Sequence, residues 1–336
     1  MKKKHIVHIL LVILAVYFLA IFQLPYYIYK PGSADALNPI VEVEDGYSSK
    51  GDMHLVTVSG AQATPMQFLL AKILPHHDVL PIDEVFPEGI TDDEYMHVQL
   101  QMMENSQEAS TVVAYQAADK QISIDYNGVY VAMVVENMPA EGKLEMGDRI
   151  IRVDDKKITQ ADDLLDYIQT KRAGDTISVE FVRDDETMTE SITLKELKDL
   201  DNKPGIGIQL VTDRAVSVDP EVKFSSGQIG GPSAGLMFSL EIYDQLTKED
   251  ITKGYEIAGT GEIDYDGNVY RIGGIDKKVV AADKEGVDIF FAPNEQGKKG
   301  SNYQVALETA KEIETDMKIV PVDTFEDAIT YLEELK

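Results

Sequence analysis

Residues 228–238 read QIGGPSAGLMF, a glycine-rich turn followed at once by an apolar run that predicts a helix. Ser233 stands between Gly231 and Gly235, so this segment satisfies the G-x-S-x-G pattern of a nucleophile elbow. Glycines let the backbone approach a substrate carbonyl closely, and the amides at a helix start can stabilise an oxyanion. Ser233 is therefore either a nucleophile or a helix cap, and the rest of the chain must decide between these two roles.

A neutral serine needs a base within hydrogen-bond reach before it can act as a nucleophile. All six histidines precede Ser233, which excludes the Ser–Asp–His chain order of α/β-hydrolases. An order with histidine before serine leaves a His-dependent serine hydrolase open as an alternative, with the candidate bases His54, His76, His77 and His97. The chain contains no H-E-x-x-H, which excludes that class of zinc metalloprotease.

Lysine is the other candidate base, because its pKa shifts readily when the amine loses its water. Two lysines, Lys277 and Lys278, begin the helix that is predicted to start near Ile275. At helical spacing Lys278 shares an apolar face with Ile275 and Ala282, and such a face can desolvate an amine. Lys277 shares its face with Lys284, and a second cation indicates a wetter surface. The pattern therefore favours Lys278 slightly.

Together with G-G-P-S-A-G, the stretch AGTGEIDYDGNVYRIGGIDKKVVAADKEGVDIFFAP (residues 258–293) resembles the proteolytic domain of the Lon family. The resemblance covers residues 204–336, and it implies an α+β domain that the strands and helices of residues 38–118 complete. It also implies a serine endopeptidase with a Ser-Lys dyad. In this dyad Ser233 is the nucleophile and Lys278 the general base. The residues with supporting roles are Thr260, which orients the lysine, Gly231 and Ala234.

The sequence departs from Lon proteases in two respects. Gly230 stands where the soluble family usually has an acid, and no G-x-x-x-x-G-K-[ST] is present, so the chain encodes no P-loop ATPase module. Without such a module the chain has no ATP-driven means to unfold a substrate. This predicts an ATP-independent endopeptidase that cleaves peptides or already unfolded segments. No nucleotide, metal or other cofactor is expected.

Residues 119–198 resemble a PDZ domain, a β-rich, partly open barrel that would be inserted before the catalytic half. The resemblance rests on Gly142-Lys-Leu144 followed by Gly147-Asp148-Arg-Ile150. It implies a loop that receives a peptide C-terminus or an extended segment by strand addition. It places that loop at Gly128, Val129, Tyr130 and Val131. A module that only spaces its neighbour is one alternative, and a non-catalytic PDZ peptide-binding scaffold is a second function class.

The N-terminus predicts a membrane anchor. Lys2, Lys3 and Lys4 precede an apolar run from residue 6 to 22, interrupted only by His8, and the run continues to Tyr26 and Tyr27. This length, with basic residues before it and aromatic residues after it, is typical of a transmembrane helix whose N-terminus is cytoplasmic. We therefore expect an uncleaved anchor in residues 1–30, a single-pass cell-membrane location and an extracellular catalytic part. A cleaved signal peptide is the alternative.

The composition restricts the partners. Thirty-one Lys and Arg against 59 Asp and Glu give a net charge of −28, which argues against a nucleic-acid surface, and the absence of cysteine removes thiol catalysis and disulfides. An anchor, a PDZ domain and a Ser-Lys dyad together resemble the membrane-anchored, PDZ-containing Lon-like peptidases of Gram-positive bacteria (the SepM/YlbL type). That resemblance implies peptide substrates, in some members a secreted signalling peptide, and since Lon relatives form rings it leaves an oligomer open.

Overall fold

The computed structural model describes residues 3–86, 92–197 and 202–335. The chain folds into two compact units. Unit 1 comprises residues 1–121 and 218–336, and unit 2 comprises residues 122–217. Unit 2 is thus an insertion in the chain of unit 1. Each unit has a hydrophobic core of its own.

Unit 1 is built on a six-stranded mixed sheet of order β18-β17-β14-β3-β1-β4. β14 pairs in parallel with β3 and β17, and β17 pairs in parallel with β18, whereas β1 is antiparallel to β3 and β4. Strands from before and after unit 2 therefore share one sheet. The strands are β1 (Tyr26–Ala36), β3 (Met53–Gln62), β4 (Asp78–Pro81), β14 (Ile257–Gly259), β17 (Ile289–Pro293) and β18 (Lys318–Val322).

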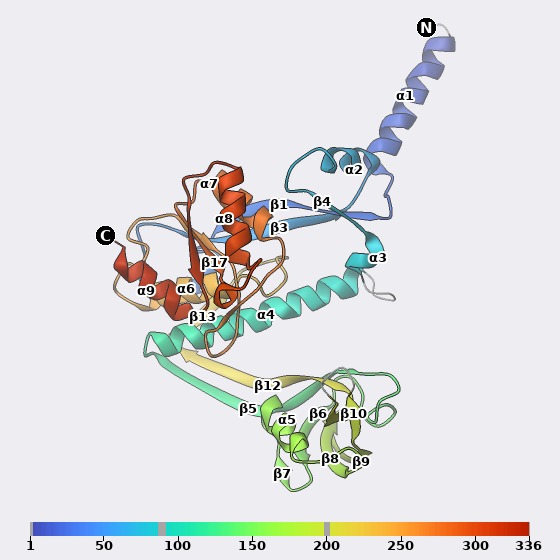
Figure 1. The fold of residues 1–336 in the computed structure, drawn as a ribbon, viewed down its shortest axis with the longest axis vertical. Helices are drawn as coiled ribbons and strands as arrows, with labels where there is room; N and C mark the ends of the chain where they lie inside the picture. The colour runs from blue at the N-terminus through green and yellow to red at the C-terminus, as the bar shows by residue number, and fades with distance from the viewer. Residues whose placement is uncertain (1–2, 87–91, 198–201, 336) are drawn as a thin grey trace. The chain divides into compact units, whose positions relative to one another are not determined.

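Helices cover both faces of this sheet (Figure 1). α7 (Ile275–Glu285) and α8 (Asn302–Glu312) pack on one face, and α6 (Gly235–Leu246) and α9 (Phe325–Glu334) pack on the other. Alternation along β17 explains the two layers, since successive side chains of a strand point to opposite faces. Phe290 lies in the core under α7 and α8, while the ring of Phe291 contacts Tyr331 of α9 at a centroid distance of 5.8 Å.

The longest helix of the described residues, α4 (Asp92–Ala117), packs against α6 (Figure 1). Two small antiparallel ladders complete unit 1, β2 (Val41–Val43) with β13 (Val222–Phe224) and β15 (Glu262–Ile263) with β16 (Val269–Tyr270). The remaining elements are α1 (Lys3–Ile21), α2 (Pro65–Ala71), α3 (Ile82–Val85) and the 3₁₀ turn η2 (Glu295–Gly297).

The expected transmembrane anchor is wrong. Among the described residues, no helix combines the length and the apolar character that a membrane crossing requires. α1 ends at Ile21, and the residues that were expected to end the anchor, Tyr26 and Tyr27, belong to β1 and pair with β3 and β4 instead. Lys2 of the expected anchor lies outside the described residues. The single-pass cell-membrane location with an extracellular catalytic part is overturned with the anchor.

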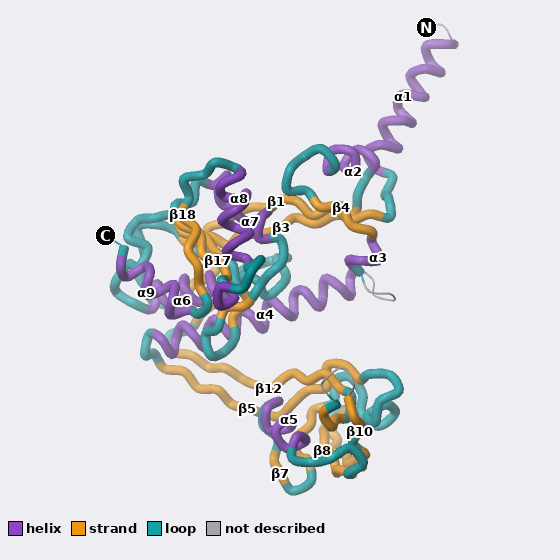
Figure 2. Tube along the Cα trace, viewed as in Figure 1, coloured by secondary structure: helices purple, strands orange, loops and turns teal. Residues whose placement is uncertain are grey.

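Unit 2 is mainly strand, with α5 (Ala161–Gln169) as its helix within the described residues (Figure 2). Its sheet has the order β12-β5-β6-β8-β9, and β7 pairs with β6. Leu164 and Ile168, one helical turn apart on α5, pack on the apolar side of this sheet. The strands are β5 (Gln121–Val134), β6 (Arg149–Val153), β7 (Lys156–Lys157), β8 (Thr176–Arg183), β9 (Glu186–Thr193) and β12 (Ile208–Asp219), with β10 (Lys195–Leu197) and β11 (Lys203–Gly205) as a separate pair.

The place of β12 differs from the expected boundary. The sequence after residue 204 was expected to open the proteolytic domain, but residues 208–217 belong to unit 2, where β12 is the edge strand beside β5. An alternating strand pattern predicts a half-buried strand without predicting its partner, which explains the difference.

The two-layer packing predicts the effect of a core truncation. Phe290→Ala removes a side chain with no solvent exposure from beneath α7 and α8, so the free energy of unfolding should fall by about 3–5 kcal/mol. Urea titration measures this loss. Leu307→Ala on the outer side of α8, where the leucine is 41% exposed, serves as the control and should cost less than about 1 kcal/mol. Equal losses in the two variants would contradict the assigned core.

Candidate active site

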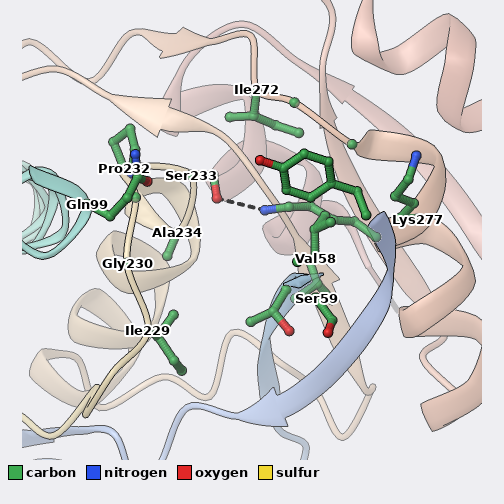
Figure 3. Close-up of a pocket in the computed structure, with 18 of the residues that line it drawn as sticks. Val58, Ser59, Gln99, Ile229, Gly230, Pro232, Ser233, Ala234, Ile272 and Lys277 are labelled. Carbon is green, nitrogen blue, oxygen red and sulfur yellow. Dashed lines mark hydrogen bonds between the residues drawn. The ribbon is translucent and has the colours of Figure 1, made fainter. Parts of the chain in front are cut away.

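Ser233 stands immediately before the N-cap of α6. The helix begins at Gly235, its N-cap is Ala234, and no side chain caps it. The Ser233 hydroxyl therefore has no capping role. Its Oγ lies 2.7 Å from Nζ of Lys278, which comes from the first turn of α7 (the dashed line in Figure 3). The structure thus brings together the two residues that the sequence proposed as a dyad.

The Lys278 amine is buried among hydroxyl groups. The residue is 4% exposed, and Nζ contacts Oγ of Ser233 and, at 3.0 Å, Oγ1 of Thr260. Loss of water around the amine lowers the pKa of Lys278 to about 7, and none of the carboxylates that the structure describes opposes this shift. A large share of these amines is therefore neutral near pH 7, with a lone pair that can accept a proton.

Thr260 joins the lysine to the backbone of the serine. It follows β14 directly and has no solvent exposure. Its hydroxyl donates to the carbonyl oxygen of Ser233 at 2.9 Å and accepts from Lys278 Nζ. The amide of Gly261 donates to the same carbonyl, also at 2.9 Å. These bonds fix the amine and the serine relative to each other.

Lys277 differs from the expectation of a wetter surface. It is only 2% exposed, and its Nζ forms ion pairs with Asp78 at 2.5 Å and with Asp276 at 3.1 Å. Asp78 is on β4, far away in sequence, so the helical pattern could not reveal that Lys277 is buried and paired with it. Lys278 is still the better candidate for the general base, but for another reason. Lys277 has carboxylate partners, which keep an amine charged, whereas Lys278 has hydroxyl partners.

The turn before Ser233 is packed against α4. Gly231 has a φ of +90°, which favours glycine, and its amide donates to the carbonyl oxygen of Gln99 at 2.7 Å. A Cβ on Gly230 would lie 2.7 Å from Cβ of Gln99, so an acid in place of Gly230 would collide with this helix. The Gly231 amide is therefore occupied. By contrast, the amides of Ser233 and Ala234 have no acceptor within the described parts of the chain.

Two buried serines of α4 also hold this region, and neither was predicted from the sequence. Oγ of Ser106 donates to the carbonyl oxygen of Pro232 at 3.0 Å, and Oγ of Ser110 donates to that of Gly235 at 2.8 Å. A serine inside a helical pattern carries no signal of a distant partner. The i, i+4 spacing of the pair places both on one face, which was the available clue.

A pocket of about 850 Å³ opens beside the dyad. Val58 and Ser59 of β3 line the side away from Gln99 and Pro232 (Figure 3). Its remaining walls come mainly from the turn before Ser233, from residues 271–274 before α7, and from Tyr27, Tyr29 and Tyr95. Tyr27, expected in a membrane interface, thus faces this pocket instead. Among the described residues, no cluster of His, Cys, Asp or Glu side chains could hold a metal ion.

No histidine is among the described residues that line this pocket. His54 is hydrogen-bonded through Nε2 to Oε2 of Glu256 at 2.7 Å, and Nδ1 of His77 lies 2.8 Å from the carbonyl oxygen of Pro75. His76 lies near two carboxylates, and His97 is on α4 outside the pocket lining. The alternative of a histidine base for Ser233 therefore finds no geometric support.

In unit 2, Gly128, Val129, Tyr130 and Val131 form no loop. They lie within β5, where Val129 pairs with Ile150 and Tyr130 with Arg149 of β6, and β12 occupies the other side of β5. The expected loop is therefore wrong. β12 and β9 are the two edge strands of this sheet, and the start of α5 lies beside β12, because the amide of Ala161 donates to Oγ1 of Thr212 at 3.0 Å.

Comparisons with known families find two domain families in this chain, with bounds that differ from those of the two units. Residues 185–332 match the Lon protease (S16) C-terminal proteolytic domain, and residues 95–194 match the PDZ domain family. The chain therefore contains a PDZ domain and a Lon-type proteolytic domain.

Individual relatives cover less of the chain. The Lon protease of Metamycoplasma arthritidis is 30% identical over 151 residues, which are 45% of this chain and 17% of that protein. The Lon protease of Campylobacter concisus is 38% identical over 100 residues, 30% of this chain and 11% of that protein. This chain thus spans less than a fifth of either curated relative. A solved PDZ domain of an SdrC-like protein from Listeria monocytogenes is 36% identical and covers 26% of this chain and 90% of that one, with a TM-score of 0.24.

The lowered pKa of Lys278 predicts a pH-dependent cost to stability. Above pH 7 the folded amine is largely neutral, whereas the unfolded amine keeps its proton up to about pH 10.4. The unfolded chain thus binds more protons in this window, and this group's contribution to the free energy of unfolding rises with pH. Lys278→Met removes the titrating amine. The free energy of unfolding of the variant should therefore be higher than that of the wild type at pH 7, and the gap between the two free energies should shrink toward pH 10.

Urea titrations of both proteins at pH 6, 8 and 9.5 measure that difference. At pH 6 the amine carries its proton in most folded and unfolded molecules, so the difference should be larger there than at pH 8 and smallest at pH 9.5. A difference that does not change between pH 7 and 10 would contradict a neutral buried amine.

Proposed function

We propose that this protein is an ATP-independent serine endopeptidase in which Ser233 is the nucleophile and Lys278 the general base. The observation that carries the proposal is the buried Lys278 amine, which lies 2.7 Å from the Ser233 hydroxyl and has hydroxyl groups as its partners. A neutral amine in this place can take the proton of a serine, and a lysine that stayed charged could not. The family matches support the same class of reaction.

The reaction then proceeds by acyl transfer. Neutral Lys278 accepts the Ser233 proton while Oγ attacks the peptide carbonyl, and the resulting ammonium donates that proton to the departing amine. Water hydrolyses the ester in a second round, with Lys278 again as the base. Thr260 accepts a hydrogen bond from Nζ, so that the lone pair of the neutral amine is directed at Ser233.

The negative charge on the carbonyl oxygen needs hydrogen-bond donors. Gly231, expected in a supporting role, donates its amide to Gln99 and is not available. The amides of Ser233 and Ala234 have no acceptor within the described ranges and stand at the start of α6, where the helix dipole also favours a negative charge. We assign the oxyanion site to these two amides, which gives Ala234 its supporting role.

The pocket favours an extended substrate. β1 pairs with one side of β3, and β14 pairs with the other side only from Met53 to Leu55. On that second side, the part of β3 from Val56 to Gly60 has no strand beside it among the described residues. The same residues line the pocket next to the dyad. A peptide or an already unfolded segment can pair its backbone with this edge, whereas most backbone groups of a folded domain are already paired.

Unit 2 would bind peptides at a different place from the one expected. A sheet binds an incoming strand at an edge with unpaired backbone groups, and in this unit β12 is such an edge. The neighbouring start of α5 supplies a second wall. We therefore propose that a peptide adds to β12 alongside α5 and not at residues 128–131. A purely non-catalytic scaffold would share this binding but show no turnover.

The dyad predicts loss of peptide cleavage on substitution. Ser233→Ala and Lys278→Met should each lower kcat/KM by at least about a thousandfold, and the double variant should lose little more, because the two residues act as a unit. In the wild type, kcat/KM should rise with pH through about 7 as Lys278 becomes neutral. Mass spectrometry of peptide fragments from a diverse peptide mixture measures these effects.

Lys277→Met is the matched control, since it removes a neighbouring buried amine of equal size. It breaks the ion pairs with Asp78 and Asp276 but leaves the dyad in place, so kcat/KM should stay within about tenfold of the wild type. Full turnover by Lys278→Met together with an inactive Lys277→Met would refute the assignment of the base. Peptide binding without any cleavage by the wild type would favour the scaffold.

Peptide binding to unit 2 predicts a specific footprint. Addition of a peptide to the full-length Ser233→Ala chain should slow hydrogen exchange at β12, because open backbone amides become bonded. Exchange at residues 128–131 should not change, since these residues already lie between two strands. Mass spectrometry of proteolytic fragments resolves the two segments. Protection at 128–131 with none at β12 would restore the site expected from the sequence.

A further inference from the structure

We infer that Ser106 of α4 is a positioning residue that orients the Ser233 amide toward the oxyanion site. Its hydroxyl holds the carbonyl of Pro232, which belongs to the same peptide unit as that amide. The inference rests on the proposed function, since it assigns a role within the same reaction.

Peptide geometry links the two groups. In a trans peptide the carbonyl and the amide hydrogen point in opposite directions across one plane. Ser106 pulls the Pro232 carbonyl oxygen toward α4 at 3.0 Å, so the Ser233 N–H must point away from α4. The Ser233 carbonyl is likewise held, by Thr260 and Gly261, and this fixes the next amide, that of Ala234. Both amides of the proposed oxyanion site are thus set by bonds to the carbonyls behind them.

The hydrogen bond of Ser106 is unusual for a helical serine. A serine or threonine inside a helix commonly donates to the carbonyl four residues earlier, as Thr111 does to Gln107 at 2.8 Å. Ser110 divides its single proton between the carbonyls of Ser106, at 2.6 Å, and Gly235, at 2.8 Å. Ser106 instead donates to the carbonyl oxygen of Pro232, its one acceptor among the described residues. Its hydroxyl therefore bonds to the turn before α6 and not to a carbonyl of its own helix.

The surroundings leave this hydroxyl little freedom. Ser106 is 3% exposed, and a Cβ on Gly235 would lie 2.8 Å from its Oγ and 2.7 Å from a methyl group of Ile263. The start of α6 thus approaches α4 as closely as a glycine permits. The contact from Ser106 to Pro232 is a fixed part of a close-packed interface, where a small change displaces the neighbouring backbone.

Removal of this hydroxyl should affect the transition state more than the ground state. Ser106→Ala leaves the Pro232 carbonyl without its donor, and the peptide unit can then rotate and turn the Ser233 amide away. Loss of one oxyanion donor typically lowers kcat by about 10²–10³-fold, so partial misorientation should lower kcat by at least about tenfold. KM should change by less than about threefold, because the walls of the pocket are unaltered.

The experiment compares four full-length proteins on one cleaved peptide: the wild type, Ser106→Ala, Ser106→Thr and Ser110→Ala. Ser110→Ala is the matched control, since it removes another buried α4 hydroxyl that holds the Gly235 carbonyl behind the site. It should keep kcat within about threefold even if it lowers thermal stability as much as Ser106→Ala does. Ser106→Thr retains the hydroxyl but adds a methyl group to this close-packed interface, so its kcat should lie between those of Ser106→Ala and the wild type.

A peptide boronate that forms a tetrahedral adduct with a serine gives a second readout. Its inhibition constant should rise in Ser106→Ala by the same factor by which kcat falls, while binding of the uncleaved peptide to the Ser233→Ala form should not change when Ser106→Ala is added. Wild-type values of kcat and boronate affinity in Ser106→Ala would overturn the inference and leave the dyad intact. Equal losses of kcat in Ser106→Ala and Ser110→Ala would reduce both serines to a structural role and also overturn it. A wild type that neither cleaves nor binds the boronate would overturn the proposed function itself.

Discussion

The burial of one amine without a carboxylate partner is the constraint on which the proposed site depends. A buried lysine costs stability unless it is paired or neutral, and Lys277 and Lys278 resolve this problem in opposite ways. Lys277 keeps ion pairs with Asp78 and Asp276, whereas the partners of the Lys278 amine within the described ranges are hydroxyl groups, and its pKa is lowered to about 7. Two adjacent residues of one helix thus have different electrostatic surroundings, because Asp78 of β4 and Asp276 of α7 both pair with Lys277.

The sequence allowed the Lon-type and PDZ parts of the chain to be predicted because their signals are local. The residues that flank Ser233 and the stretch from Thr260 to Lys278 carry spacing that the fold preserves, and their proximity is observed. The alternation of apolar residues likewise predicted strands that exist, including β12.

The incorrect predictions share one physical cause, which is that partners distant in sequence leave no local signal. The apolar N-terminal run was extended into a membrane span, but its last aromatic residues are held by β3 and β4. The resemblance to a PDZ domain implied a loop at Gly128 and its neighbours, yet these residues lie in β5, and β12, about 80 residues later, pairs with that strand. Ser106 gave no signal because its acceptor, Pro232, lies 126 positions away.

The two ends of unit 2 leave and rejoin unit 1 at neighbouring points, and this bears on how such chains can evolve. Tyr115, near the end of α4, donates from its hydroxyl to the carbonyl oxygen of Pro220 at 2.5 Å, so the outgoing and returning segments are fastened together inside unit 1. An insertion whose two ends meet at a clamp of this kind imposes little strain on its host, and its length affects the closure entropy only logarithmically. The host sheet can therefore accept replacement of the inserted module by another of different size, so recognition and chemistry can diversify independently within one polypeptide.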